Sequence, residues 1–377
     1  MFNINEKNFE LAKQLRHELH MHPELSMEEK WTKQHVMDFL KANTTKWDVV
    51  DRGDWFYAAY KAENPKKKIA FRGDFDAIPV YDDIEAEWKS QFDGVGHKCG
   101  HDGHVANLCL TALEIEEKGC NNDVYLVFQH AEEIGAGGEP CSVVMEEEKV
   151  DEVYGAHNSA GFDKDLVVVK PGINNCASEG MEIIFDGVPA HASQPEHGKN
   201  PSLAVCSIVQ AIPELIAPEK WEGLVLCTVV QIDVGERAFG CAAAKGKLLM
   251  TLRAQNGPEL EKLQQIIEDM AIEQAKEYGL GVGFIYHDVF PETRSWPECV
   301  DKVKAACDAI GQPWFQREDF QRGSEDFGHF MKNTPGAYFI VGNGKDTPAI
   351  HTVKFDFPDT HIKLVCDVFG QLAGIRK

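Results

Sequence analysis

The sequence predicts an α/β protein with a mostly parallel sheet, interrupted by an inserted α+β domain of the ferredoxin-like type. Four short apolar runs of strand length lie at 69–71, 124–128, 153–156 and 337–341, and polar or acidic residues follow each run. Such continuous apolar runs are typical of strands buried on both faces of a parallel sheet. Between the third and fourth runs, 176–290 gives the order strand, helix, strand, strand, helix, strand, which is the split βαβ motif.

Length and composition are those of a globular protein large enough for two domains. The chain has 377 residues, 43% hydrophobic and 26% charged, and no apolar run approaches the length of a membrane span. The formal net charge of -23 argues against nucleic acid or an anionic membrane as a partner. Its 11 cysteines show no close-paired framework and its start is charged, so we expect reduced thiols in a cytoplasmic protein.

Two helices are expected in the N-terminal segment. Apolar residues recur at helical spacing over 6–22, Pro23 ends this pattern, and a second helix is expected over 28–42. Three histidines, His17, His20 and His22, gather at the end of the first helix. We expect them to be packing or surface residues of a helix end rather than a metal site.

Two alternating carboxylates, Asp74 and Asp76, follow the apolar run at 69–71. Aspartates are common in turns, where they accept hydrogen bonds from the backbone. The functional alternative is that Asp76 orients a histidine that binds a metal, a task that carboxylates often have behind a ligand.

The segment 97–104, with the sequence HKCGHDGH, holds three imidazoles, one thiol and one carboxylate within eight residues. Cys99 and His101 cannot share a helix face, but both could reach one ion if Gly100 turns the backbone between them. From Asp102 onward, apolar residues at helical spacing predict a helix that ends at Gly119, with Asp102 near its N-cap. Such a helix start favours the thiolate of Cys99. Taken alone, the segment fits a metal site and a solvated His-rich turn equally well.

The other strands of the predicted sheet also end near potential ligands. Glu132 and Glu133 follow the run 124–128 before a Gly-rich turn, where one glutamate could bind a cation while the other acts as a base. His157 follows the third run, and His351 lies in a loop after the fourth. Because sites in open α/β sheets form at the carboxyl ends of the strands, this coincidence favours the metal site.

The inserted domain is expected over 176–290, which leaves 1–175 and 291–377 as one discontinuous domain. Pro171-Gly172 and Pro291 mark the two linkers. Two helices, over 200–216 and 258–278, are expected to cover one face of its four-stranded sheet. The apolar strands over 181–185 and 224–232 are expected to offer an unpaired edge, which favours pairing with a second copy of the chain. The expected homodimer forms through this domain, edge to edge or helix to helix.

Several motifs in this order resemble those of the zinc-dependent aminoacylase and carboxypeptidase-type amidohydrolase family. The most similar branch is that of hippurate hydrolase, indole-acetyl-amino-acid hydrolase and acetyl-diaminopimelate deacetylase. The motifs are LHMHPELS (19–26), RGDFDAIP (72–79), CGHDGH (99–104), AEE (131–133), AHA (190–192), GSEDF (323–327) and the late His351. The resemblance implies a metallo-hydrolase domain formed by 1–175 and 291–377, and a lid and dimerisation domain formed by 176–290.

Carried over residue by residue, the resemblance implies two divalent ions, with zinc, manganese, cobalt and nickel all open. Glu132 would be the general base, Asp76 the partner of a ligand histidine, and His191 in the lid a group that stabilises the oxyanion. The metal ligands would be Cys99, His101, Glu133, His157 and His351. The candidate substrate contacts are Arg253, Asn158 and Ser324.

The implied reaction is hydrolysis of the amide bond of a small N-acyl amino acid by metal-activated water, in a homodimer. A dipeptidase or carboxypeptidase of the same family is the alternative. A Cys99 nucleophile with His97 or His101 as its base would leave both glutamates without a task. A catalytically idle metal- or peptide-binding protein on the same fold is a third class.

Three positions depart from the pattern of this branch and leave the substrate open. His130 stands where a proline is usual, and Asn158-Ser159 replaces a frequent bulky pair. Gly240-Cys241-Ala242 stands where an Asn-containing segment that contacts the substrate is common.

Overall fold

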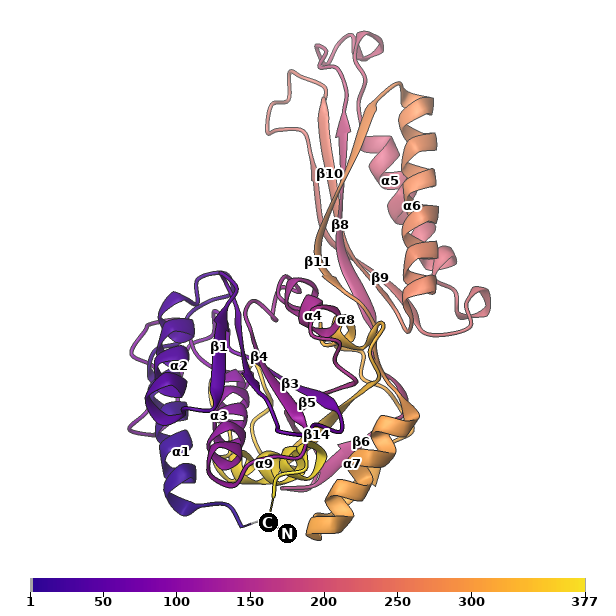
Figure 1. The fold of residues 1–377 in the computed structure, drawn as a ribbon. Coiled ribbons are helices and arrows are strands. Elements are labelled where there is room, and N and C mark those ends of the chain that lie inside the picture. Colours follow the sequence, from indigo (N-terminus) through magenta and orange to yellow (C-terminus); the bar gives the residue numbers. More distant parts are fainter. Residues whose placement is uncertain (1–2, 377) are drawn as a thin grey trace. The chain divides into compact units, whose positions relative to one another are not determined.

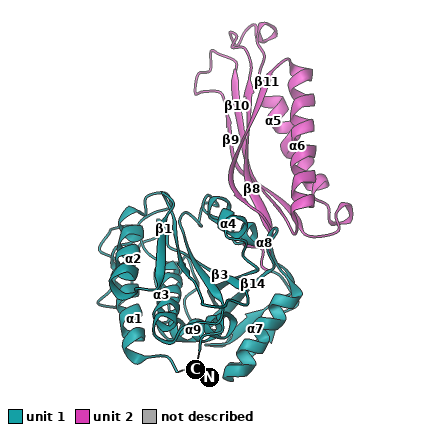
Figure 2. Cartoon of the chain, in the orientation of Figure 1, with its two compact units in different colours: residues 1–174, 293–320, 326–377 teal, residues 175–292, 321–325 magenta. Residues whose placement is uncertain are grey.

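The chain folds into two compact units in a computed structural model that describes residues 3–376 (Figure 2). Unit 1 comprises the chain up to 174, 293–320 and the chain from 326 onward, and unit 2 comprises 175–292 and 321–325. The short segment 321–325 is the main difference from the boundaries expected from the sequence. It groups with unit 2 because its backbone pairs there: Gln321 forms a bridge with Asn175 and accepts a hydrogen bond from the N–H of Cys176.

Unit 1 is built on an eight-stranded sheet in the order β1-β2-β4-β3-β5-β14-β6-β13 (Figure 1). Its four central strands run parallel and are the four apolar strands predicted from the sequence. They are β4 (Asp123–Gln129), β3 (Lys68–Asp74), β5 (Glu152–Ala160) and β14 (Gly336–Gly344). Every residue of β4 is buried, as expected of a strand covered on both faces. The carboxyl ends of these four strands meet at one edge of the sheet.

Short strands that the sequence analysis did not predict extend this sheet on both sides. The antiparallel pair β1 (Trp47–Asp51) and β2 (Phe56–Tyr60) continues it beyond β4, and β6 (Val167–Val169) and β13 (Trp314–Gln316) continue it beyond β14. A further two-stranded sheet joins β7 (Gly172–Asn175) to β12 (Thr293–Ser295). These strands have three to five residues, against seven to nine in the four central strands, and carry a weaker pattern in the sequence.

Helices pack on both faces of the sheet of unit 1. Alternate residues of β4 show the two layers: Val124, Leu126 and Phe128 pack with one set of helices, and Tyr125 and Val127 with the other. The first set is α1 (Glu6–Met21), α2 (Lys30–Asn43), α3 (His101–Lys118), α7 (Pro297–Ile310) and α9 (Thr360–Ala373). The second set is α4 (Gly138–Glu147) and α8 (Gly328–Met331). Among the described residues, no helix is both long enough and apolar enough to cross a bilayer.

Unit 2 has the predicted order of two helices and four strands, and its sheet is antiparallel in the order β11-β8-β10-β9. The elements are β8 (Ala177–Asp186), α5 (Ser202–Leu215), β9 (Val225–Val234), β10 (Lys245–Ala254), α6 (Gly257–Tyr278) and β11 (Gly281–Phe290), with short 3-10 turns at Pro195–His197 and Pro218–Lys220. Both helices share one apolar core with the sheet. The expectation that the strand at 181–185 offers an edge is wrong, because β8 pairs with β10 on one side and β11 on the other. The edge strands are β9 and β11.

Candidate metal centre and active site

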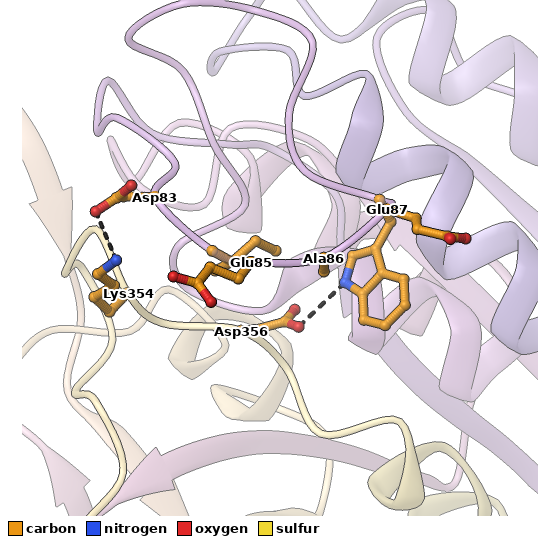
Figure 3. A pocket seen from close by; sticks show the side chains of 8 residues that line it. Asp83, Glu85, Ala86, Glu87, Lys354 and Asp356 are labelled. Carbon is orange, nitrogen blue, oxygen red and sulfur yellow. Dashed lines mark hydrogen bonds and ion pairs between the residues drawn. The ribbon is translucent and has the colours of Figure 1, made fainter.

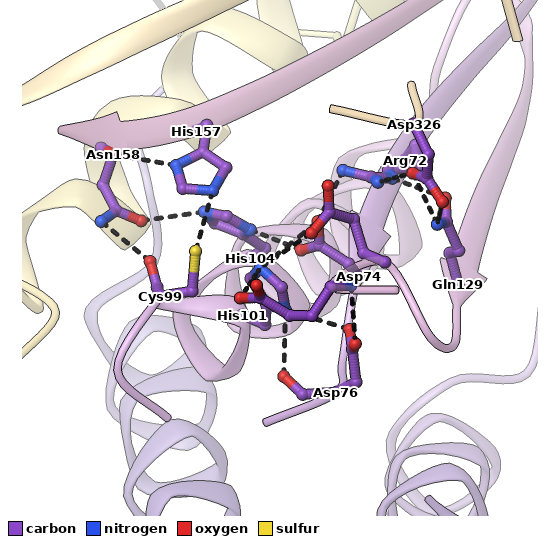
Figure 4. Close-up of polar contacts among 12 residues, drawn as sticks. Arg72, Asp74, Asp76, Cys99, His101, His104, Gln129, His157, Asn158 and Asp326 are labelled. Atoms are coloured by element: carbon purple, nitrogen blue, oxygen red, sulfur yellow. Dashed lines mark hydrogen bonds and ion pairs between the residues drawn. The ribbon is translucent and has the colours of Figure 1, made fainter. Parts of the chain in front are cut away.

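The carboxyl edge of the sheet in unit 1 gathers the five predicted metal ligands, and Figure 4 labels three of them, Cys99, His101 and His157. Sγ of Cys99 lies 3.4 Å from Nε2 of His157. Nε2 of His101 lies 3.8 Å from Oε1 of Glu133, and the same oxygen lies 3.3 Å from Nε2 of His351. Donor atoms of Cys99, His101 and His157 form one close group, and those of Cys99, Glu133 and His351 form another, all within 4.8 Å in each group. The two groups share Cys99.

The turn at Gly100 brings Cys99 and His101 to the same place. Gly100 has a φ of +104°, and a Cβ atom at this position would collide with the side-chain oxygen of Asn158. Helix α3 begins at His101 with Gly100 as its N-cap, so Asp102 lies in its first turn, near the N-cap as expected, but no side chain caps the helix. The carboxylate of Asp102 instead pairs with buried side chains of α1, at 2.8 Å from both Arg16 Nε and His20 Nδ1.

Asp76 fixes the orientation of His101. Nδ1 of His101 lies 2.9 Å from the carbonyl oxygen of Asp76 and 3.1 Å from its Oδ1. Both oxygens are acceptors, so Nδ1 carries the proton and Nε2 faces the glutamates. Nε2 of His101 and Oε1 of Glu133 are buried and make no hydrogen bond to the described residues. Burial alone would lower the pKa of His101, but the carboxylates of Asp74 and Asp76 outweigh it and raise the pKa to about 10.

The same carboxylate also reaches the turn after β4. Oδ2 of Asp76 accepts hydrogen bonds from the backbone N–H of Glu133 at 3.0 Å and from the hydroxyl of Ser26 at 2.7 Å. Burial opposes its ionisation, but the hydrogen bond from His101 lowers the pKa of Asp76 below its usual value. Asp76 therefore connects the end of β3, the start of α3 and the segment that carries Glu132 and Glu133.

The thiol of Cys99 differs from the expectation. Nδ1 of His157 donates to the carbonyl oxygen of Asn158 at 2.7 Å, so Nε2 of His157 is an acceptor and the Cys99 thiol is the donor in their contact. Burial and the neighbouring carboxylates of Glu133 and Glu132 raise the pKa of Cys99 well above its usual value. The helix start does not outweigh these carboxylates, so the expected thiolate does not form without a cation to offset them.

A buried hydrogen-bonded chain behind the ligands was not predicted. His104 in α3 contacts Oδ1 of Asp74 at 2.5 Å through Nδ1 and Oδ1 of Asn158 at 2.9 Å through Nε2. The amide nitrogen of Asn158 donates to the carbonyl oxygen of Cys99 at 3.1 Å, so its oxygen must accept from His104. In these two contacts the ring nitrogens of His104 are the donors. Asn158, a predicted substrate contact, is only 2% exposed, and its side-chain amide is engaged in this chain.

This chain continues to a buried arginine. Arg72 in β3 pairs with Asp74 at 2.6 Å and with Asp326 at 2.6 Å, and Gln129 at the end of β4 contacts both Arg72 and Asp326. The motifs RGDFDAIP and GSEDF contain three of these residues, and this was the one signal in the sequence that pointed to them. Their pairing needs the fold, because Arg72 and Asp326 lie 254 positions apart.

The remaining predicted residues lie in unit 2. His191 is exposed, its Nδ1 lies 2.7 Å from Oγ of Ser193, and its backbone bridges to Cys241. Arg253 in β10 donates to Oγ of Ser324 at 2.8 Å and also to a backbone carbonyl at Arg322. The structure thus brings Arg253 and Ser324 together within unit 2.

The other histidine candidates do not join the metal centre. His20 bridges Asp102 and Asp82, at 2.8 Å and 3.2 Å, as a buried packing residue, in accord with the sequence analysis. Both ring nitrogens of His97 are buried and make no hydrogen bond to the described residues, and burial lowers its pKa to about 3. The imidazole that contacts the Cys99 thiol belongs to His157, so the structure does not support His97 as a base for Cys99.

Unit 1 also has a pocket of about 550 Å³ that shares no residue with the metal centre (Figure 3). Two of its carboxylates already have partners. Asp83 pairs with Lys354 at 2.7 Å, and Asp356 accepts from the indole of Trp88 at 3.1 Å. The lining residues are Asp83, Ile84, Glu85, Ala86, Glu87, Trp88, Lys354 and Asp356.

The donor set at the carboxyl edge fits a divalent cation. One thiol, three imidazoles and a carboxylate are the ligand types that zinc and similar transition metals accept. The buried ligand atoms of His101 and Glu133 make no hydrogen bond within the described part of the chain. A second carboxylate, Glu132, lies beside them, with Oε2 at 3.9 Å from Nε2 of His101. An α/β fold with this site at its strand ends defines a metal-dependent hydrolase.

The chain belongs to Peptidase family M20/M25/M40, whose family model matches residues 70–374. It is 26% identical over 348 residues to an N-acetyldiaminopimelate deacetylase of Exiguobacterium sibiricum, covering 91% of this chain and 93% of that protein. It is 27% identical over 368 residues to a hippurate hydrolase of Campylobacter jejuni, covering 95% and 94% of the two chains.

A solved structure supports the fold over nearly the whole chain. The YXEP protein of Bacillus subtilis, described as a dinuclear metal-binding peptidase of the M20 family, superposes with a TM-score of 0.80 at 22% identity. The match covers 98% of this chain and 99% of that one. The protein is accordingly a metal-dependent amidohydrolase of this family.

Proposed function

We propose that the protein hydrolyses the amide bond of small N-acyl amino acids, with Glu132 as general base beside a two-metal centre. The observation that carries this proposal is the convergence of Cys99, His101, Glu133, His157 and His351 beside a second glutamate. The names of two relatives, N-acetyldiaminopimelate deacetylase and hippurate hydrolase, support an N-acyl amino acid as the substrate class.

Two ions are proposed because two donor groups overlap at one thiol. Cys99, His101 and His157 form the first group, and Glu133 and His351 join Cys99 in the second. The dinuclear description of the Bacillus subtilis structure is consistent with this number. The ions would supply an acidified water and a polarised carbonyl group. Zinc, manganese, cobalt and nickel all accept this set of ligands.

The protein's own residues would then move the proton and hold the substrate. Glu132 takes a proton from the attacking water and returns it to the leaving amine. Asp76 keeps Nε2 of His101 directed at the centre. In unit 2, His191 would stabilise the oxyanion, and Arg253 with Ser324 would bind the substrate carboxylate.

A homodimer formed through unit 2 is part of the proposal, and a cytoplasmic location remains a prediction of the sequence. The edge strands β9 and β11 expose apolar side chains, among them Val230, Ile232 and Ile285. Exposed apolar strands of this kind favour pairing with a second copy.

Substitution of the two adjacent glutamates tests the assigned roles. Glu132→Gln should retain bound metal but lose about 10²–10⁴-fold in turnover, because only the base is removed. Glu133→Gln should lose metal affinity as well. Metal content and rates on acetyl-amino acids, benzoyl-amino acids and dipeptides, measured with each metal separately, check both outcomes.

Glu139→Gln, an exposed glutamate in α4, is the control and should behave as the unaltered protein. The roles are wrong if Glu132→Gln loses the metal while Glu133→Gln keeps it. Faster cleavage of dipeptides than of N-acyl amino acids would replace the proposed activity with that of a dipeptidase.

A further inference from the structure

The residue before Glu132 adopts a backbone conformation that L-residues rarely take. Ala131 has a φ of +48°, in the left-handed region. Its carbonyl oxygen accepts from the N–H groups of Ala136 at 3.1 Å and Gly137 at 3.2 Å, which closes the turn between β4 and α4. Gly137 has no room for a side chain, because a Cβ atom there would collide with the carbonyl oxygen of His130. This turn presents Glu132 and Glu133, so whatever holds Ala131 also holds the two glutamates.

A buried carboxylate from a distant part of the chain holds Ala131. Oε1 of Glu29 accepts the backbone N–H of Ala131 at 2.8 Å, across 102 positions of sequence. Glu29 stands at the N-cap position of α2, yet its side chain makes no capping hydrogen bond. That task falls to Glu24, whose carboxylate accepts from the N–H groups of Trp31 at 3.2 Å and Thr32 at 2.8 Å. The carboxylate of Glu29 is therefore committed to the turn rather than to its own helix.

The residues on both sides of Glu132 each have a backbone N–H group bound by a buried carboxylate. The N–H of Ala131 is bound by Glu29, and the N–H of Glu133 is bound by Asp76 at 3.0 Å. Both carboxylates depend on the same N-terminal segment. Glu29 is part of this segment, and the hydroxyl of Ser26 donates to the carboxylate of Asp76. The backbone of Glu132 is thus fixed from two directions by groups that do not belong to its own turn.

Glu29 is costly for the fold, which argues for a task in the site. It is 5% exposed, and no cationic side chain of the described residues pairs with it. Burial and the nearby carboxylate of Asp76 raise its pKa to about 7. A carboxyl group buried without a cation is unfavourable unless its hydrogen bonds compensate. An uncharged side chain with an acceptor oxygen at the same place, such as glutamine, can make the same bond to Ala131.

We propose that Glu29 is a positioning residue that sets the backbone, and through it the carboxylate, of Glu132. The inference rests on the proposed role of Glu132 as general base. Because a displacement of about 1 Å at a reacting group can cost on the order of 10²-fold in rate, a single hydrogen bond to Ala131 is enough to matter.

The test compares two substitutions of similar length. Glu29→Met removes the acceptor and should lower kcat at least about 10-fold, with KM and bound metal within about twofold of the unaltered protein. Glu29→Gln keeps an acceptor oxygen and should retain kcat within about threefold, which a role in packing alone does not explain. Glu28→Gln, an exposed neighbour, is the control. If Glu29→Met does not fold, Glu29→Ala replaces it in the same comparison.

A second measurement separates this inference from the proposed function. In the Glu132→Gln background, Glu29→Met should cost no further activity, because the group that it positions is already gone. Full activity of Glu29→Met, equal losses in the Met and Gln variants, or an additive loss in the double variant would each overturn the role of Glu29. Full activity of Glu132→Gln would instead refute the proposed base, whatever Glu29→Met does.

Discussion

Nδ1 of His101 lies 2.9 Å from the carbonyl oxygen and 3.1 Å from the carboxylate oxygen of Asp76. Both contacts require the ring proton on Nδ1, so Nε2 is the ring atom that faces Glu132 and Glu133. A carboxylate behind a ligand histidine fixes the ring and makes it a stronger donor. Asp76 thereby prepares one ligand of the proposed metal centre.

Asp76→Asn should weaken this ligand. The amide cannot match a carboxylate as acceptor for the His101 N–H, so metal affinity should fall about 10–100-fold. Competition with a chelator of known affinity measures the change. Asp93→Asn, an exposed aspartate of the same unit, is the control and should leave affinity unchanged. Equal affinities in both variants would show that Asp76 does not support the ligand.

Gly100→Ala should disrupt the turn that brings Cys99 and His101 together. The added Cβ meets the side chain of Asn158, and φ is +104° at this position. Gly53 is a matched control, because its φ is +92° but a Cβ atom there has open space. Gly53→Ala should cost about 1–3 kcal/mol of unfolding free energy through backbone strain alone.

Gly100→Ala should cost more than this control and should also reduce bound metal. Denaturant unfolding and metal analysis of the two variants provide the comparison. If both variants lose similar stability and keep their full metal content, the contact with Asn158 is not the reason why position 100 requires glycine.

The parts of the site that the sequence predicted are those set by strand ends. Glu133 and His157 follow apolar runs closely, Cys99 and His351 lie in the loops after two other runs, and parallel strands bring such positions to one edge. The chain of hydrogen bonds through His104 was not predicted, because its partners come from separate strands and depend on register. Asp102 lies in the first turn of α3 as predicted, although Gly100, which has no side chain to signal a cap, takes the N-cap position.

The sequence likewise predicted the long elements of the fold and missed several short ones. Long amphipathic elements such as α6 show their period in sequence, whereas β6 and β13 have three residues each. The position of β8 inside the sheet of unit 2 could not be read from its apolar residues, since an interior strand and an edge strand can carry the same pattern.

His191→Ala should lower turnover while metal content and folding remain intact. Loss of one group that stabilises an oxyanion typically costs about 10²–10³-fold in kcat. If the protein is a dimer in which His191 serves the partner's site, mixing this variant with Glu132→Gln should restore part of the activity, because mixed dimers contain one complete site. A monomer by sedimentation, with full activity in His191→Ala, contradicts both parts.

The stability of unit 2 should depend on Glu179, a carboxyl group on the core side of β8. Glu179 is 5% exposed, its Oε1 makes no hydrogen bond to the described residues, and burial together with Glu268 raises its pKa to about 7. The folded protein therefore holds the proton of Glu179 up to a higher pH than the unfolded chain, in which the carboxyl group has its ordinary pKa of 4.5. The free energy of unfolding therefore has its full value below pH 4.5 and falls as the pH rises through 7.

Glu179→Gln should remove the cost of burying an ionised carboxylate without changing the shape of the side chain. At pH 8 the variant should be more stable than the unaltered protein by about 1–3 kcal/mol, and at pH 4 the two should be equal. Glu182→Gln is the control on the opposite face of the same strand, where Glu182 pairs with Lys247 at 2.5 Å and its pKa is lowered by that hydrogen bond. Glu182→Gln should therefore gain nothing at pH 8. Denaturant unfolding at the two pH values measures both variants, and an equal effect of Glu179→Gln at pH 4 and pH 8 would show that ionisation of Glu179 is not the cause.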